Sequence, residues 1–329
     1  MNLYPLKFRP ILKTKIWGGQ KLKKYGKQLQ GKTNIGESWE LSGVPDNVSV
    51  VANGFLADNE LNDLLEVYMS DLVGDSVYEL FGNQFPLLFK FIDANHDLSI
   101  QVHPDDDTAL TRHNSMGKTE MWYVMDVEDD ATLTVGFADN CDKQTYLEAL
   151  QNDKVESLLK KIRVKKGDVI FIHPGLIHSI GKGILLAEIQ QASDITYRIY
   201  DYNRKDENGK TRELHTDLAL DIIDFSVSTP QIDYTLNING ATNLVQCPYF
   251  TTNIISLNRT IQRDYAKLDS FVVYLCLEGS LLIETEAEPC TLQKGETVLI
   301  PAVLNDVVLR PTSQEVKILE VYMDQIDQI

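Results

Sequence analysis

The sequence contains few cysteines and no long hydrophobic run, and these absences exclude several classes of protein. Its four cysteines include no C-x-x-C pair, so neither a disulfide framework nor a thiolate zinc site is expected. No run of about 18 apolar residues occurs, and the N-terminal segment has no apolar stretch of signal-peptide length. We therefore expect a cytoplasmic protein that is neither exported nor embedded in a membrane.

Positive charge is also scarce. The 31 lysines and arginines face 48 aspartates and glutamates, which gives a formal net charge of -17. We therefore expect no nucleic-acid partner and no anionic membrane surface as a partner. An anionic small molecule would need a local cluster of cations, against the global field. The 329 residues suit one large or two ordinary soluble domains, as a monomer or a small homo-oligomer.

Short β-branched and aromatic runs make up most of the chain. Examples are "PLLFKFID", "MWYVMDV", "ATLTVGF" and "DITYRIYDY", separated by glycine, proline and asparagine. Leucines at helical spacing occur near residues 57–83 and again near 141–162. The sequence therefore predicts a mainly β fold, a sandwich or barrel, with these two helical segments inserted in it or appended to it.

An internal repeat predicts that there are two barrels. Residues 164–178, "VKKGDVIFIHPGLIH", align without gaps with residues 292–306, "LQKGETVLIPAVLND", and residues 120–135 align more faintly with 271–285. We expect a first domain over residues 1–235 and a second over 236–329. In this alignment His178 corresponds to Asp306 and Glu120 to Phe271, so we expect no metal site in the second barrel.

Four polar residues of the first barrel are candidates for one metal site. Gln101 and His103 are two apart in a strand that ends at Pro104, so their side chains point to the same face. Glu120, in "GKTEMWYV", and His178, in "HPGLIHSI", belong to other predicted strands. Two imidazoles, a carboxylate and an amide oxygen suit Zn²⁺ with room for substrate. Alone, His103 could simply end a strand and Glu120 could be a solvated edge residue, so the hypothesis depends on the set.

Three cations accompany this set. Lys118 is two residues before Glu120 and shares its face, and Lys90 interrupts the apolar run "PLLFKFID". A buried lysine needs a carboxylate or a cavity, whereas on an edge strand Lys90 would point to water. Arg198 suits a phosphate or an enediolate, because its guanidinium can bind two oxygens at once. Its structural alternative is an ion pair with Asp194 or Asp201.

In combination, these segments closely resemble the type I mannose-6-phosphate isomerases of the short bacterial kind. The resemblance is carried by "WGG" (17–19), "GESWELS" (36–42), "FPLLFKFID", "LSIQVHPDD", "GKTEMWYV", "IHPGLIHSI" and "EIQQASDITYRIYDY". It implies two cupin (jelly-roll) barrels and a zinc-dependent aldose–ketose isomerase. Such an enzyme interconverts mannose 6-phosphate and fructose 6-phosphate through an enediol.

The resemblance also assigns residues. One Zn²⁺ per chain would be bound by Gln101, His103, Glu120 and His178, with Arg198 and Lys118 as catalytic residues. His173-Pro174 departs from the family pattern, which leaves the role of His173 open. Substrate binding is expected to involve Lys90, Trp17 and Glu40.

Several alternatives stay open at this point. The proton-transferring base is Lys118, a metal-bound water or Glu40. Two rival functions, an iron dioxygenase and a metal-binding sugar sensor without turnover, also fit a cupin, because fold alone does not determine function.

Overall fold

β-Strands dominate the structure, as the β-branched and aromatic runs of the sequence predict. The computed structural model describes residues 3–205, 208–324 and 329. In this part of the chain the strands form four sheets, which pair into two jelly rolls. The predicted mainly β, two-cupin fold is confirmed, although each unit is a pair of facing sheets and not one closed barrel. No helix among these residues is long and apolar enough to cross a membrane.

The N-terminal jelly roll consists of a seven-stranded and a five-stranded antiparallel sheet. The larger sheet has the order β13 (Gln231–Ile232), β9 (Val169–Ile172), β6 (Glu120–Val127), β11 (Ile184–Gln191), β4 (Leu87–Ala94), β3 (Ile35–Leu41) and β2 (Ile11–Gly19). The smaller sheet has the order β12 (Tyr197–Tyr200), β5 (Ile100–Val102), β10 (His178–Ile180), β7 (Thr132–Phe137) and β8 (Leu159–Arg163).

The C-terminal jelly roll repeats this plan with a six-stranded and a four-stranded sheet. The larger sheet has the order β1 (Leu6–Lys7), β20 (Thr297–Ile300), β17 (Val272–Glu278), β22 (Val316–Tyr322), β15 (Thr251–Leu257) and β14 (Gly240–Gln246). The smaller has β16 (Ile261–Asp264), β21 (Asp306–Pro311), β18 (Ser280–Glu284) and β19 (Cys290–Gln293). Because β1 pairs with β20, the start of the chain belongs to the second jelly roll, across the expected boundary at residue 235.

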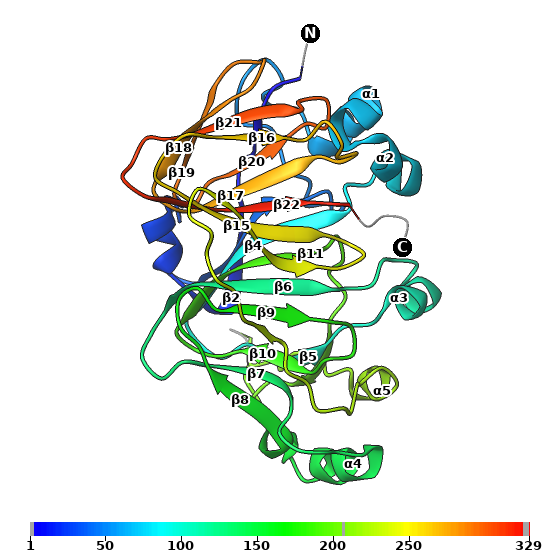
Figure 1. Cartoon of the computed structure of the whole chain (residues 1–329). Helices are drawn as coiled ribbons and strands as arrows, with labels where there is room; N and C mark the ends of the chain where they lie inside the picture. Colours follow the sequence, from blue (N-terminus) through cyan, green and yellow to red (C-terminus); the bar gives the residue numbers. More distant parts are fainter. Residues whose placement is uncertain (1–2, 206–207, 325–328) are drawn as a thin grey trace.

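The four sheets are stacked as layers, with the two larger sheets in the middle (Figure 1). Strand β6 shows why: Trp122 and Val124 point into the N-terminal jelly roll, whereas Met121 and Tyr123 belong to the core between the jelly rolls. Strand β17 alternates in the same way, with Tyr274 inside its own jelly roll. Both faces of each central sheet are therefore buried, which accounts for the nearly continuous apolar runs.

The helices agree with the sequence in part. The segment near 57–83 forms α1 (Leu61–Val73) and α2 (Asp75–Phe81), but this segment docks on the C-terminal jelly roll, where Ala302 N–H donates to Leu72 O (3.0 Å). The segment near 141–162 forms α4 (Lys143–Gln151) and the 3₁₀ turn η2 (Val155–Leu158), and then becomes strand β8. The remaining helical elements are η1 (Lys21–Tyr25), α3 (Asp106–His113) and α5 (Thr216–Leu220).

The repeat is real, but two of its aligned pairs are displaced by one residue. Glu120 lies opposite Ile172 and Val272 lies opposite Ile300, so Val272 takes the place of Glu120. Phe271 points instead into the core between the jelly rolls. Similarly, Asp306 is exposed, and Val307 is the residue that faces inward as His178 does. A gapless alignment misses this, because it does not show which face of a strand each residue occupies, and a shift of one residue reverses the face.

Candidate active site

The candidate metal residues come together at one end of the N-terminal jelly roll. Gln101 lies on β5, His103 follows that strand, and Glu120 and His178 are the first residues of β6 and β10. Pairing of β5 with β10 places His178 directly opposite Gln101. Strand β5 ends at Val102, two residues before Pro104, and Asp105 then caps α3 by accepting a hydrogen bond from Thr108 N–H (2.9 Å).

The two imidazoles are aimed at each other. Their Nε2 atoms lie 3.1 Å apart, while each Nδ1 is 2.8 Å from a backbone carbonyl, Ile195 O for His103 and Leu176 O for His178. These carbonyls accept a hydrogen bond from Nδ1–H, so both Nε2 atoms present lone pairs. Glu120 completes a triad, with Oε1 3.4 Å from His178 Nε2 and Oε2 3.7 Å from His103 Nε2.

Burial gives this triad the properties of a cation site. Burial holds the pKa of His103 well below its ordinary value and lowers that of His178 to about 4, so both rings are neutral. The same cause raises the pKa of Glu120 to about 7. Neither Glu120 oxygen has a hydrogen bond within the described residues, and the side chain is fully buried. Two lone pairs and a fully buried carboxylate in one space fit a divalent cation.

Gln101 is the fourth member of the predicted set. Its side-chain amide lies 3.4 Å from His103 Nε2 and 3.3 Å from His178 Nε2. Rotation of the amide by 180° exchanges its nitrogen and oxygen and would present the oxygen to an ion. The geometry thus brings together all four residues that the sequence nominated.

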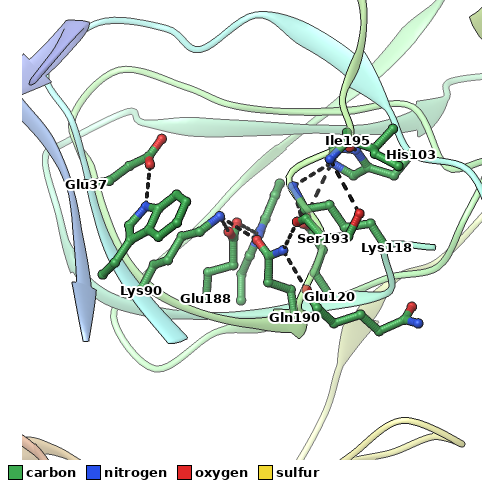
Figure 2. A network of polar contacts seen from close by, with 12 residues as sticks. Glu37, Lys90, His103, Lys118, Glu120, Glu188, Gln190, Ser193 and Ile195 are labelled. Carbon is green, nitrogen blue, oxygen red and sulfur yellow. Dashed lines mark hydrogen bonds and ion pairs between the residues drawn. The ribbon is translucent and has the colours of Figure 1, made fainter. Parts of the chain in front are cut away.

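Two lysine side chains belong to the buried polar contacts around the triad (Figure 2). Lys118 Nζ lies 3.2 Å from His103 Nε2 and 3.3 Å from Glu120 Oε2. Lys90 Nζ lies 2.9 Å from Glu188 Oε1 and also donates to Gln190. Strand β4 lies between β11 and β3, so Lys90 is not an edge residue exposed to water.

The Lys90–Glu188 pair stays charged. Burial lowers the pKa of Lys90, but the carboxylates of Glu188 and Glu37 outweigh this effect and leave the pKa raised. Burial raises the pKa of Glu188, and the ammonium groups of Lys90 and Lys118 turn the net shift downward. Trp122 Nε1–H donates to the second oxygen of Glu188 (2.9 Å).

A pocket opens beside this network. Trp17, Lys90, Gln101, Lys118 and Arg198, all nominated from the sequence, line it. Further lining residues are Lys15, Glu37, Trp39, Glu188, Asp194 and Arg212.

Arg198 faces this pocket and is not part of a surface ion pair. It lies opposite Gln101 in the pairing of β12 with β5. Within the described residues it has no carboxylate within ion-pair distance, and its buried Nε has no hydrogen-bond partner. Asp201 pairs instead with Arg204 and Arg212. The alternative of an ion pair with Asp194 or Asp201 is therefore wrong for this structure.

Glu40 is the expected substrate residue that the structure places elsewhere. It lies on the face of β3 opposite Glu37 and Trp39, because side chains alternate along a strand. Its carboxylate is buried against Lys27 Nζ (2.6 Å), which also donates to Gly295 O of the C-terminal jelly roll (2.7 Å). Glu40 thus joins the two units and does not line the pocket. His173, left open, lies 4.0 Å from Asp224 and outside the triad.

Sequence reasoning missed several pocket residues, among them Glu188, Glu37 and Arg212. A signal existed for Glu188, since it interrupts "GILLAEIQQ" just as Lys90 interrupts its own apolar run. A buried carboxylate in such a run needs a partner. The sequence does not show that the partner is Lys90, 98 residues away.

Comparison with known proteins gives one consistent result. A family model described as phosphomannose isomerase type I, catalytic domain, matches residues 6–126, and one described as mannose-6-phosphate isomerase, cupin domain, matches residues 240–318. The chain is 35% identical to mannose-6-phosphate isomerase ManA of Bacillus subtilis over 94% of this chain and 96% of that protein. It is 34% identical to the mannose-6-phosphate isomerase of Streptococcus mutans over 90% and 92% of the two chains.

The structural comparison agrees. The crystal structure of the mannose 6-phosphate isomerase from Bacillus subtilis superposes with a TM-score of 0.87 at 33% identity, over 97% of this chain and 99% of that chain. Fold and site thus define a two-cupin protein with one candidate metal centre in its described residues. The chain belongs to the type I mannose-6-phosphate isomerase family, and it is an enzyme of that class.

Proposed function

We propose that this enzyme is zinc-dependent and interconverts mannose 6-phosphate and fructose 6-phosphate through an enediol. The observation that carries the proposal is the buried His103–Glu120–His178 triad, which adjoins a cationic pocket in an acidic protein. Residues 1–235 would hold the reaction, and the unit over 236–329 would hold no metal.

The charge of the pocket supports a phosphorylated substrate. Five cationic side chains (Lys15, Lys90, Lys118, Arg198 and Arg212) and three anionic ones (Glu37, Glu188 and Asp194) line it. The pocket therefore has a positive excess in a chain whose formal charge is -17. Such a local field attracts an anion that the protein as a whole repels.

The donor set supports Zn²⁺. Two imidazole nitrogens, a carboxylate and an amide oxygen are ligands that zinc accepts, and ligands at a strand end leave positions for substrate. When bound there, the ion would polarise the sugar carbonyl and stabilise charge on the neighbouring oxygens.

Isomerisation transfers the C2 proton of the aldose to C1 and a second proton between the two oxygens. We assign the carbon proton transfer to Lys118, because its Nζ lies beside the triad and lines the pocket. Glu40, the other side chain considered for this role, faces away. Arg198, one strand from Gln101, would stabilise the enediolate, and Arg212 would contact the phosphate.

The test is an assay of purified protein with mannose 6-phosphate. Production of fructose 6-phosphate should cease after chelation and return when Zn²⁺ is added. Turnover in deuterated water should introduce deuterium at C1 of fructose 6-phosphate, because an enediol exchanges its proton with solvent. Turnover that fully retains the substrate proton would contradict the enediol, and unchanged activity without metal would contradict the zinc requirement.

A variant separates Lys118 from its surroundings. Lys118→Met should keep bound zinc but lose both turnover and deuterium exchange. The matched control is Lys160→Met, a lysine on β8 outside the pocket, which should retain full activity. Normal exchange in Lys118→Met would assign the proton transfer to another group.

A further inference from the structure

The segment that carries Lys118 enters the site without strand pairing. Residues 116–119 form no regular element, yet their backbone is fixed. Lys118 N–H donates to Pro104 O (3.0 Å), Thr119 N–H to Gln191 Oε1 (2.8 Å) and Gly117 N–H to Asp106 Oδ1 (2.7 Å). Two of these three acceptors are side chains, so the position of Lys118 depends on Asp106 and Gln191.

Asp106 is the centre of this arrangement. Its Oδ1 accepts from Gly117 N–H and from Gln191 Nε2 (2.9 Å), and its Oδ2 accepts from the hydroxyl of Tyr249. A Cβ on Gly117 would lie 2.6 Å from Asp106 N, so the segment packs directly against the start of α3. A small displacement of Asp106 would therefore move Gly117 and the lysine that follows it.

The third contact of Asp106 comes from the other jelly roll. Tyr249 lies between β14 and β15 and is half-buried. Burial and the hydrogen bond to Asp106 raise the pKa of Tyr249, so its hydroxyl remains a donor. Neither Tyr249 nor Asp106 lines the pocket formed by the described residues.

We propose that Tyr249 and Asp106 are positioning residues, through which the C-terminal jelly roll holds Lys118 in place beside the metal centre. The inference rests on the proposed function and goes beyond it, since it gives the C-terminal jelly roll a part in turnover. Tyr249 would fix the carboxylate of Asp106, which would in turn fix the backbone of residues 117–119.

The first test removes one hydroxyl far from the substrate. Tyr249→Phe should lower kcat by about 10-fold, less than the ~10²-fold that a 1 Å misplacement can cost, with bound zinc and Tm unchanged. KM should stay within about twofold, because the lining of the pocket is intact. Asp106→Ala should lower kcat further, and Asp106→Asn should restore part of it, since an amide oxygen still accepts from Gly117 N–H.

The matched control is Tyr322→Phe in the same jelly roll. Tyr322 accepts a hydrogen bond from Asn253 (3.2 Å) and is not a partner of Asp106, so this variant should keep the parent kcat. A double variant identifies the path. If Tyr249 acts through Asp106, Tyr249→Phe should lower kcat no further once Asp106 is replaced by alanine.

Three outcomes would overturn the inference: a parent kcat in Tyr249→Phe, a loss of Tm with unchanged kcat, or an independent effect in the double variant. If Tyr249→Phe does not fold, Asp106→Asn provides the same test. Values of kcat and KM equal to those of the parent enzyme in Asp106→Asn would also overturn the inference. An inactive parent would instead contradict the proposed function, so the two failures are distinguishable.

Discussion

The two jelly rolls place a buried glutamate at the same position and surround it differently. Glu188 on β11 lies opposite Trp122 and Lys90, and Glu320 on β22 lies opposite Tyr274 and Asn253. Glu188 binds a lysine and lines the pocket. Glu320 is capped on both oxygens, by Arg263 Nε (2.8 Å) and Nη2 (2.9 Å).

The capping residues occupy the positions of candidate ligands. Arg263 lies opposite Val307 as Gln101 lies opposite His178, and Tyr265 follows Arg263 by two residues as His103 follows Gln101. Tyr265 also binds Glu320. In the C-terminal unit a guanidinium and a phenol thus fill the interior, and the guanidinium supplies the positive charge, where the N-terminal unit presents lone pairs. Equivalent positions in the two jelly rolls thus form a candidate cation site in one unit and an internal ion pair in the other, depending on which side chains occupy them.

The largest expected effect comes from removing a triad member. His178→Ala should abolish bound zinc and turnover while the fold persists, because the remaining imidazole, carboxylate and amide oxygen bind zinc weakly. Asp306→Ala, at the residue that the sequence repeat aligns with His178, should change neither. Elemental analysis should give one zinc per chain in the parent and in Asp306→Ala. A second equivalent that survives dialysis would show that the comparison between the two units is wrong.

Arg198 has no counterpart in the C-terminal unit, because the strand β16 that corresponds to β5 is an edge strand within the described sheets. Arg198→Lys should lower kcat by about 10²- to 10³-fold with zinc retained, since lysine cannot form two parallel hydrogen bonds. The same change at Arg263 should leave kcat unaltered. A near-normal kcat in Arg198→Lys would assign the charge stabilisation to Lys118.

Arg263 tests the internal ion pair of the C-terminal unit. Arg263→Met leaves the fully buried carboxylate of Glu320 without its counterion. Because the arginine side chain is 27% exposed, we expect a loss of about 2–4 kcal/mol, somewhat below the usual cost of breaking a fully buried pair. Denaturant unfolding would measure the loss, and kcat of the folded fraction should not change. An unchanged midpoint would show that Arg263 does not compensate Glu320.

These contrasts also show how far the sequence can predict the site. Gln101 and His103 were predictable from spacing within one strand, and Lys90 from a charge in an apolar run, since both signals are local. The phase of a strand is not local. The sequence suggests Glu40 at the substrate, whereas Glu37, on the other face of the same strand, lines the pocket. It also aligns Phe271 with Glu120, whereas Val272 occupies that position. In both cases the wrong face of the strand was predicted, because a shift of one residue reverses the face.

The sequence also does not show which residues far apart in the chain contact each other. Three features depend on contacts between residues far apart in the sequence. They are the pairing of Glu188 with Lys90, the addition of β1 to the C-terminal sheet and the docking of α1 and α2 on the C-terminal unit. The sequence predicts the end of a strand at Pro104 but no helix after it. Asp105 and Asp106 in fact begin a helix, where side-chain oxygens bind free N–H groups.

The smallest expected effect concerns a helix cap that crosses between the two units. Asp269 of the C-terminal unit accepts hydrogen bonds from the N–H groups of Asp75 (2.6 Å) and Ser76 (2.8 Å) at the start of α2. Asp269→Ala should cost about 1 kcal/mol, the low part of the range for caps because the carboxylate is exposed, and should lower Tm by roughly 2 °C. Asp142→Ala, which removes the cap of α4 within the N-terminal unit, is the matched control.

The effect of this cap should depend on pH. Partial burial raises the pKa of Asp269, but the hydrogen bonds from Ser76 and Asp75 outweigh this effect and hold the pKa below its ordinary value of 3.8. A group with a lowered folded-state pKa stabilises the protein above its unfolded pKa and loses this contribution as pH falls through the folded value. The difference in stability between parent and Asp269→Ala should thus stay constant from neutral pH to about pH 5 and shrink below about pH 4. A difference that persists undiminished under acid would show that the carboxylate charge plays no part, and that the contact between the units is one of packing alone.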